Sequence, residues 1–378
     1  MSHLVRVLLG GIMVFALRIP VWGEEPQVNT PPVTPASDKK TEFMVGVDAN
    51  FSLEMEPFGT QWRWGGQSED LFSGSVHHGA RWLRVRLWTS EEGHYGREYA
   101  TKLVKRSQAT GLHPYLAIFL SDDWADLEKQ PAPTIWRELP LPQRAAAVET
   151  YSRDTVLHFR QQGLQSHLYE VGNEIDYGIC GVYPAKGEGR YPASLRLRVW
   201  PEAAKLILAC QRGVKAADPQ AKFMLHIAHW WDAAFCTAFF RTMLDSGVQL
   251  DYAGLSYYPS ANIGGSLTLE QFGRVVETIH TTIQRPVIVA ETAYPSTTDF
   301  SGQFASWRTE VPGYPLTPDG QLHWLTNFLH FCAKDSNIAG VFYWSPEWYG
   351  NEVWKAFALF DNQGEARPAW KAFSDYSH

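Results

Sequence analysis

Two glutamates stand where a hydrolase that works with a pair of carboxylates would need them. Glu174 lies in the run Tyr-Glu-Val-Gly-Asn-Glu-Ile at 169–175, and Glu291 follows the apolar run Val-Ile-Val-Ala at 287–290. Each run is typical of a short buried strand. A carboxylate at the C-terminal end of a parallel strand lies at the mouth of a barrel, where side chains converge on a ligand. An isolated glutamate is more often an exposed surface acid, but two from distant strands can flank one bond.

The elements that must position these acids alternate between strands and helices from residue 42 onward. Helical periodicity is found at 203–216, 269–282 and 320–333, and residues 317–320 predict a capped start for the last of these helices. Eight runs are typical of strands, at 43–49, 82–88, 113–120, 168–172, 222–228, 252–257, 287–290 and 339–344. The pattern predicts an α/β fold, a (β/α)8 TIM barrel that forms a single catalytic domain over 41–378. The alternative is an open doubly wound sheet, but Asp-Ala-Asn-Phe-Ser at 48–52 lacks its glycine-rich phosphate turn.

The first 40 residues differ from the rest in composition. A positive charge at Arg6 precedes the apolar run 7–17, and small residues follow near position 23, which predicts a secretory signal peptide over 1–23. The apolar run is shorter than the ~20 residues of a membrane span. Residues 24–40 are rich in proline and threonine and predict a disordered linker. We therefore expect a secreted or periplasmic protein that has no membrane partner once the signal is cleaved.

Charge and cysteine content limit the other partners. The chain has 378 residues and a net charge of −7 with no basic cluster, so nucleic acid is not expected to bind. Four cysteines lie far apart without CxxC spacing, at 180, 210, 236 and 332, which gives no indication of a zinc site. Whether they pair or stay as buried thiols is left open. We expect no metal site, no cofactor and a monomer.

The strand at 82–88 places three large polar or aromatic side chains on its inner face. Its alternation puts Arg84, Arg86 and Trp88 on one side. Arginines inside a barrel are too costly to desolvate without acidic partners. We expect Arg86, which is nearer the mouth, to pair with Glu291, whereas Arg84 is assigned either to a structural ion pair or to the site. The same alternation at 251–258 directs the hydroxyl of Tyr258 toward a catalytic carboxylate.

Several short motifs occur in an order and spacing that resemble one family. They are Ser-Asp-Asp-Trp-Ala-Asp at 121–126, Val-Gly-Asn-Glu-Ile at 171–175, Gly-Leu-Ser-Tyr-Tyr-Pro at 254–259, Ala-Glu-Thr-Ala-Tyr-Pro at 290–295, Val-Pro-Gly-Tyr-Pro at 311–315, Gly-Val-Phe-Tyr-Trp at 340–344 and Leu-Phe-Asp-Asn-Gln-Gly at 359–364. From residue 43 to the C-terminus the chain resembles glycoside hydrolase family 53, the arabinogalactan endo-β-1,4-galactanases of clan A, as a divergent member.

The resemblance implies a retaining mechanism with Glu174 as acid/base and Glu291 as nucleophile. It also implies that Asn173 bonds the sugar 2-hydroxyl and that Trp344 is the platform under the sugar. Retention requires two carboxyl groups about 5–5.5 Å apart, which opposite strands of a barrel mouth can provide. The substrate-binding candidates are Arg86, Trp88, Asp122, Trp124, Asn173, His226, Tyr258, Tyr294 and Trp344.

The chain departs from the family pattern at some strand ends. Phe119 stands where members carry histidine, Ala228-His229 replaces an Asp-Asn pair, and Ser345 stands where glutamate is usual. We expect these positions to line the sugar subsites, with Phe119 facing the sugar, and therefore to affect specificity. The leading hypothesis is an exported endo-acting enzyme on β-1,4-galactan or a related β-linked plant polysaccharide. The alternatives are a clan A glycosidase with shifted, including exo, specificity, and a carbohydrate-binding pseudoenzyme, against which the presence of both glutamates argues.

Overall fold

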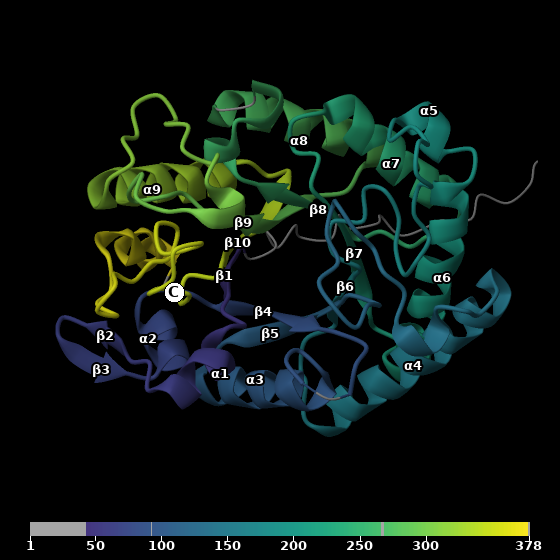
Figure 1. Ribbon diagram of the computed structural model, residues 1–378, viewed down its shortest axis with the longest axis horizontal. Helices are drawn as coiled ribbons and strands as arrows, with labels where there is room; N and C mark the ends of the chain where they lie inside the picture. Colours follow the sequence, from purple (N-terminus) through teal and green to yellow (C-terminus); the bar gives the residue numbers. More distant parts are fainter. Residues whose placement is uncertain (1–42, 92, 266–267, 377–378) are drawn as a thin grey trace, which may run out of the picture. The chain divides into compact units, whose positions relative to one another are not determined.

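Eight parallel strands close into a barrel in a computed structural model that describes residues 43–376 except 92 and 266–267 (Figure 1). Around the barrel the strand order is β1-β10-β9-β8-β7-β6-β5-β4. The strands are β1 (Met44–Asp48), β4 (Trp82–Leu87), β5 (His113–Ile118), β6 (Leu168–Val171), β7 (Lys222–Ile227), β8 (Tyr252–Tyr257), β9 (Val287–Thr292) and β10 (Ile338–Trp344). The predicted TIM barrel is confirmed, and all eight predicted strands are present. The signal peptide and linker predicted over 1–23 and 24–40 lie outside the described residues.

Helices cover the outside of the barrel (Figure 1). They are α1 (Ser52–Met55), α2 (Leu71–His77), α3 (Arg97–Thr110), α4 (Leu141–Gln161), α5 (Pro192–Leu195), α6 (Val199–Ala217), α7 (Ala233–Asp245), α8 (Leu269–Ile283) and α9 (Pro318–Lys334). A 3-10 segment, Pro368–Tyr376, follows β10, and a small antiparallel hairpin, β2 (Trp62–Trp64) with β3 (Gln67–Glu69), lies between α1 and α2. In the part of the chain that the structure describes, no helix has the length and apolarity needed to cross a membrane.

The start of α9 shows how local chemistry sets these boundaries. The hydroxyl of Thr317 accepts a hydrogen bond from the backbone N–H of Gly320 at 3.1 Å, and Pro318 occupies the first turn, where its missing N–H has no intrahelical partner to lose. The capped start predicted at 317–320 is therefore confirmed. Helices α6, α8 and α9 contain the three predicted helical segments, because their apolar stripes must pack against the barrel.

Apolar residues fill the lower part of the barrel and leave its C-terminal end to polar groups. Side chains from six strands pack together inside it, namely Met44, Tyr115, Leu168, Met224, Ile288, Ala290 and Phe342. On β4 the outward residues Leu83, Val85 and Leu87 are fully buried in the larger core that includes the surrounding helices. The inward positions nearer the C-terminal end of β4 are Arg84 and Arg86, so the site begins directly above the apolar plug.

All four cysteines are buried and carry free thiols. Of the two possibilities left open by the sequence, the structure has the unpaired one. Burial raises the pKa of the Cys180 and Cys210 thiols to about 12, which keeps them in the unreactive thiol form. Among the described residues no group of three or more histidine, cysteine or acidic side chains is arranged to hold a metal ion.

Candidate active site

The two glutamates meet at the C-terminal end of the barrel. Strand β6 ends at Val171, and the backbone then passes through positive φ at Gly172 (79°) and Glu174 (46°), a tight turn that brings Glu174 over the barrel mouth. Glu291 lies within β9 and is the register partner of Ser256 on β8. The hydroxyl of Ser256 donates to Oε1 of Glu174 at 2.6 Å. Both acids are therefore close to one serine at this end of the barrel.

Arg84 ties Glu291 to the floor of the site. The guanidinium is fully buried and all five of its N–H groups are used. Their acceptors, at 2.6–2.8 Å, are the carboxylates of Asp48, Glu170 and Glu291 and the amide oxygen of Asn173. The cation is therefore shared by three buried acids and fixes their orientation.

The predicted pairing of Arg86 with Glu291 is wrong, because Arg84 makes that contact. Arg86 is fully buried one layer higher, and its Nε lies 3.3 Å from Oδ1 of Asp48. Aromatic rings enclose the guanidinium, with centroids 4.6–5.8 Å from it, namely Phe51, Tyr95, Trp124 and Trp344. Cation–π attraction and Asp48 thus hold Arg86 behind an aromatic wall, where it has no exposed face for a sugar.

Tyr258 lies where the sequence placed it. Its hydroxyl donates to Oε2 of Glu291 at 2.8 Å, while Oε1 accepts from Arg84 at 2.8 Å. Asn173 is 4% exposed, and its Nδ2 donates to the carbonyl of Ala125 at 2.9 Å. Both oxygens of Glu291 and both ends of the Asn173 amide are therefore fixed before any substrate arrives.

The two acids differ in their electrostatic surroundings. Burial and the neighbouring charge of Glu291 raise the pKa of Glu174 to about 8. Burial also raises the pKa of Glu291, but Arg84, His226 and the Tyr258 hydroxyl oppose that effect. For the fully buried Glu170, Arg84 and His226 outweigh burial and lower the pKa to about 2. Because Glu174 alone of these three contacts no arginine, the proton of the Glu174–Glu291 pair belongs on Glu174.

Three predicted sugar-binding tryptophans lie at or after strand ends at the C-terminal end of the barrel. Trp344 ends β10 and is 7% exposed, with its ring 4.4 Å from that of Trp354 and 6.5 Å from that of Trp124. Trp88 and Trp124 are half-buried and meet edge to face at 5.6 Å. Trp344 and Trp124 lie over Arg86, and Trp88 packs against Trp124, so the three predicted sugar-binding tryptophans form one cluster. Their flat apolar faces suit the apolar faces of a sugar ring.

Two predicted substrate contacts are enclosed within the protein. His226 is fully buried beneath the acids, between Glu170 and Ser256. Tyr294 is also fully buried. Its ring stacks on Trp324 at 4.9 Å, and its hydroxyl bonds only main-chain groups of the loop at 311–314. Tyr294 therefore anchors a loop instead of facing a ligand.

Asp122 and Phe119 also lie away from the position expected for a sugar contact. Oδ2 of Asp122 accepts from the backbone N–H of Thr134 at 2.7 Å and so holds the loop after β5. Phe119 is fully buried in a cluster with Ala117 and Ala125 that Trp88 and Trp124 cover. The expectation that Phe119 faces the sugar is not met, because the loop at 121–126 folds Trp124 over it.

Three buried polar residues of the site escaped the sequence analysis. Glu170 and Ser256 both bond His226, and Glu347 accepts a hydrogen bond from the backbone N–H of Phe51 at 2.7 Å. Burial raises the pKa of the Glu347 carboxyl to about 8. For Glu170 and Ser256 the available signal was an acidic or hydroxyl residue inside a run of strand periodicity, since such a group needs a buried partner. Glu347 follows β10 and carried no such signal.

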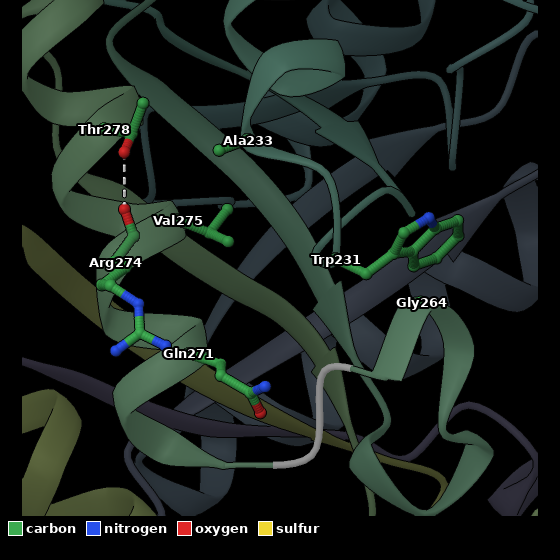
Figure 2. A pocket seen from close by; sticks show the side chains of 7 residues that line it. All are labelled: Trp231, Ala233, Gly264, Gln271, Arg274, Val275 and Thr278. Atoms are coloured by element: carbon green, nitrogen blue, oxygen red, sulfur yellow. Dashed lines mark hydrogen bonds between the residues drawn. The ribbon is translucent and has the colours of Figure 1, made fainter.

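A separate pocket lies between α7 and α8 (Figure 2). Arg274, Gln271 and Thr278 project from α8 on one side of it, and Trp231 and Gly264 lie across from them. Neither glutamate lines this pocket. The Thr278 hydroxyl donates to the carbonyl of Arg274 at 2.7 Å. The residues that line this pocket include no pair of acids for the chemistry above.

We expect Arg84→Met to destabilise the fold by about 3–5 kcal/mol, because it removes the one cation that the buried carboxylates of Asp48, Glu170 and Glu291 share. Urea unfolding at pH 7 measures the change. The control is Arg106→Met, because Arg106 is partly exposed and pairs with two partly exposed acids, and its loss should cost about 1 kcal/mol or less. Equal losses for the two variants would contradict the central role assigned to Arg84.

An eight-stranded barrel whose C-terminal end holds two acids, the half-buried Glu174 and the buried Glu291 that arginine and tyrosine hold, is the arrangement of barrel glycosidases. The model of glycosyl hydrolase family 53 matches residues 44–373, and the chain belongs to this family. It is therefore a glycoside hydrolase, as the motifs predicted.

Named relatives and a solved structure agree with this assignment. An arabinogalactan endo-beta-1,4-galactanase of Cellvibrio japonicus is 29% identical over 89% of this chain and 92% of its own length. A probable arabinogalactan endo-beta-1,4-galactanase A of Aspergillus terreus is 30% identical over 76% of this chain and 80% of its own. The GH53 catalytic domain of Ignisphaera aggregans superposes with a TM-score of 0.76 and 25% identity, covering 92% of this chain and 99% of that domain.

Proposed function

We propose that this protein is an exported, retaining glycoside hydrolase that cleaves β-1,4-galactan or a related β-linked plant polysaccharide and acts as a monomer. Glu174 is its acid/base and Glu291 its nucleophile. One observation carries the assignment of roles. Glu291 is held by Arg84 and Tyr258, whereas the partners of the Glu174 carboxyl group among the described residues are Ser256 and, at 3.4 Å, the backbone N–H of Leu127. The relatives named above support the substrate class.

In the proposed reaction, the carboxylate of Glu291 attacks the anomeric carbon while Glu174 gives its proton to the leaving oxygen. The first step yields a glycosyl ester on Glu291 and a free alcohol. Esterification removes the negative charge that helps to keep the pKa of Glu174 high. The pKa of Glu174 then falls, so the same group can act as the carboxylate base that takes a proton from the attacking water.

The substrate contacts divide into two layers in this proposal. Trp344, Trp124, Trp88 and Asn173 are assigned to the sugar, with Trp344 as the platform and Asn173 as the partner of the 2-hydroxyl. Arg86, Asp122, His226 and Tyr294 are enclosed or spent on the protein, and they support the first layer from behind. Tyr258, a predicted substrate contact, instead donates a hydrogen bond to Glu291 and holds its carboxylate in place.

A panel of polysaccharides tests the proposed substrate. Galactan, arabinogalactan, mannan and β-glucan are each incubated with the enzyme, and reducing ends and product lengths are measured. We expect reducing ends to appear fastest from galactan, with short oligomers among the early products because the action is endo. Glu291→Gln is the control for traces of other enzymes.

Other outcomes of this panel separate the alternatives. Release of a single small sugar from galactan would show that the enzyme is exo-acting and not endo-acting. Preference for another β-glycan would indicate that the changed strand ends, at Phe119, Ala228-His229 and Ser345, have shifted the specificity. If the protein binds a polymer but releases no sugar from any of them, it is a carbohydrate-binding pseudoenzyme, and the proposal is contradicted.

A further inference from the structure

A continuous chain of hydrogen bonds runs from Arg84 through the barrel floor to Glu174. The Glu170 carboxylate takes two bonds from Arg84, at 2.6 and 2.8 Å, and Nδ1 of His226 lies 3.0 Å from its Oε1. Nε2 of His226 lies 2.9 Å from the hydroxyl of Ser256, which reaches Oε1 of Glu174 at 2.6 Å. Glu170, His226 and Ser256 are fully buried, so no water competes for these bonds.

Counting hydrogens along the chain sets its charge. A serine hydroxyl has one hydrogen, and when Ser256 gives it to Glu174 it must accept from Nε2–H of His226. Nδ1 of the same ring faces Glu170, which Arg84 keeps ionised, so Nδ1 carries a hydrogen as well. Both ring nitrogens are then donors, and His226 is an imidazolium.

The surroundings of His226 agree with that charge. Burial opposes it, but the carboxylate of Glu170 and the more distant one of Glu291 raise the pKa of His226 despite the nearby positive charge of Arg84. Glu174 in turn faces the acids Glu291 and Asp176 and the cation of His226.

We propose that Ser256 is a positioning residue that transmits the charge of the His226–Glu170 pair to Glu174. The inference rests on the proposed function, in which Glu174 is the acid/base. Because Oε1 accepts from Ser256, the acid proton is left on Oε2, whose only other contact among the described residues is the long one to Leu127. When that proton moves to the glycosidic oxygen, the new carboxylate is already bonded to a donor backed by a cation. Nothing has to reorganise at the moment of reaction.

The proposal predicts a shift in pH dependence with a definite sign. The Ser256 hydroxyl stabilises the ionised form of Glu174, so its removal raises the pKa of Glu174. In the pH profile of kcat/KM, the basic limb reports the loss of the acid proton. For Ser256→Ala we expect this limb to move upward by roughly 0.5–1 pH unit, the equivalent of one hydrogen bond. The acidic limb should stay in place, because Glu291 keeps Arg84 and Tyr258.

The experiment compares two substrates over the full pH range. Ser256→Ala should lose roughly 3–10-fold in kcat/KM on polysaccharide at neutral pH and much less on an aryl glycoside with a good leaving group, which needs little protonation. Ser256→Thr keeps the hydroxyl and should return the basic limb toward its original position. Ser75→Ala is the matched control, because Ser75 is equally buried and its hydroxyl donates to the main-chain carbonyl of Leu71. Urea midpoints show whether each variant is folded.

A second variant separates the charge from the hydrogen bond. His226→Gln keeps a donor toward Ser256 but removes the positive charge. In the unchanged protein that charge also favours the ionised form of Glu291. Both limbs should then move upward. This pattern differs from that of Ser256→Ala and identifies His226 as the source of charge.

The result that would overturn the proposal is a folded Ser256→Ala enzyme whose basic limb is unmoved and whose loss is the same on both substrates, since that is what mere loosening of the site would produce. Failure of the proposed function gives a different result. If Glu174→Gln lost the same factor on the two substrate types, Glu174 would not be the acid/base, whatever Ser256→Ala did.

Discussion

Replacing Glu291 by alanine is expected to abolish hydrolysis, with a fall in kcat of roughly 10⁴–10⁶-fold, because no glycosyl ester can form. External azide is expected to restore cleavage of an activated aryl glycoside and to yield a glycosyl azide of inverted anomeric configuration. The small anion occupies the space of the missing carboxylate on the face of the sugar opposite the leaving group. Proton NMR of the product identifies the anomer and measures the rate of rescue.

The configuration of the azide product decides between the two glutamates. A glycosyl azide of retained configuration from Glu291→Ala would show that Glu291 is the acid/base and would reverse the assignment. The control is Glu347→Ala, which also removes a buried carboxyl group, one whose pKa burial raises to about 8. Because Glu347 bonds the backbone of Phe51 and neither Arg84 nor Tyr258, azide should not increase the activity of that variant.

The barrel could be predicted because its strands have a local signal. Each strand buries both faces, so it appears in the sequence as a continuous apolar run such as the one before Glu291. The helices show the apolar stripe that packs against the barrel, and α8 and α9 also carry threonine caps at their starts. The two acids could be predicted for the same reason, because a glutamate at the C-terminal end of such a buried run lies at the mouth of the barrel.

The height of a side chain within the barrel could not be predicted. Alternation along β4 places both Arg84 and Arg86 inside, but which of them meets Glu291 depends on how the tilted strands are staggered. The side chain of Arg84 reaches Asp48, Glu170 and Glu291, although the strand register pairs Glu170 with Ala117 and Ala117 with Arg86. Two residues further along β4, Arg86 meets the aromatic rings instead. The residue pattern of a single strand does not show which arginine meets which partner.

Loop packing explains the other discrepancies. Phe119 and Tyr294 follow strand ends, where side chains usually face the ligand. The loop at 121–126 brings Trp124 over Phe119, and the loop at 311–314 supplies main-chain partners for the Tyr294 hydroxyl. These contacts join segments without any common periodicity, so the sequence gives no sign of them.

The roles of the two glutamates also depend on long-range contacts. At the sequence level both are acids after apolar runs, and only the resemblance to a family distinguished them. In the structure the difference is physical, because Arg84 and Tyr258 stabilise a charge on Glu291, whereas burial and that same charge keep the proton on Glu174 up to a pKa of about 8. A group that holds its proton at neutral pH can deliver it to a poor leaving group.

Glu174→Gln removes that proton and keeps the size of the side chain. We expect kcat/KM on the polysaccharide to fall by roughly 10²–10⁴-fold, the usual contribution of a general acid. An aryl glycoside whose leaving group is stable as an anion should lose far less in its first step, so that the glycosyl ester accumulates and a burst of released phenol precedes slow turnover. Stopped-flow absorbance measures the burst, and azide should speed its decay with retention of configuration, because the anion attacks the ester from the side of residue 174. An equal loss on both substrates, without a burst, would contradict the role of Glu174 as the acid/base and leave its raised pKa without a catalytic purpose.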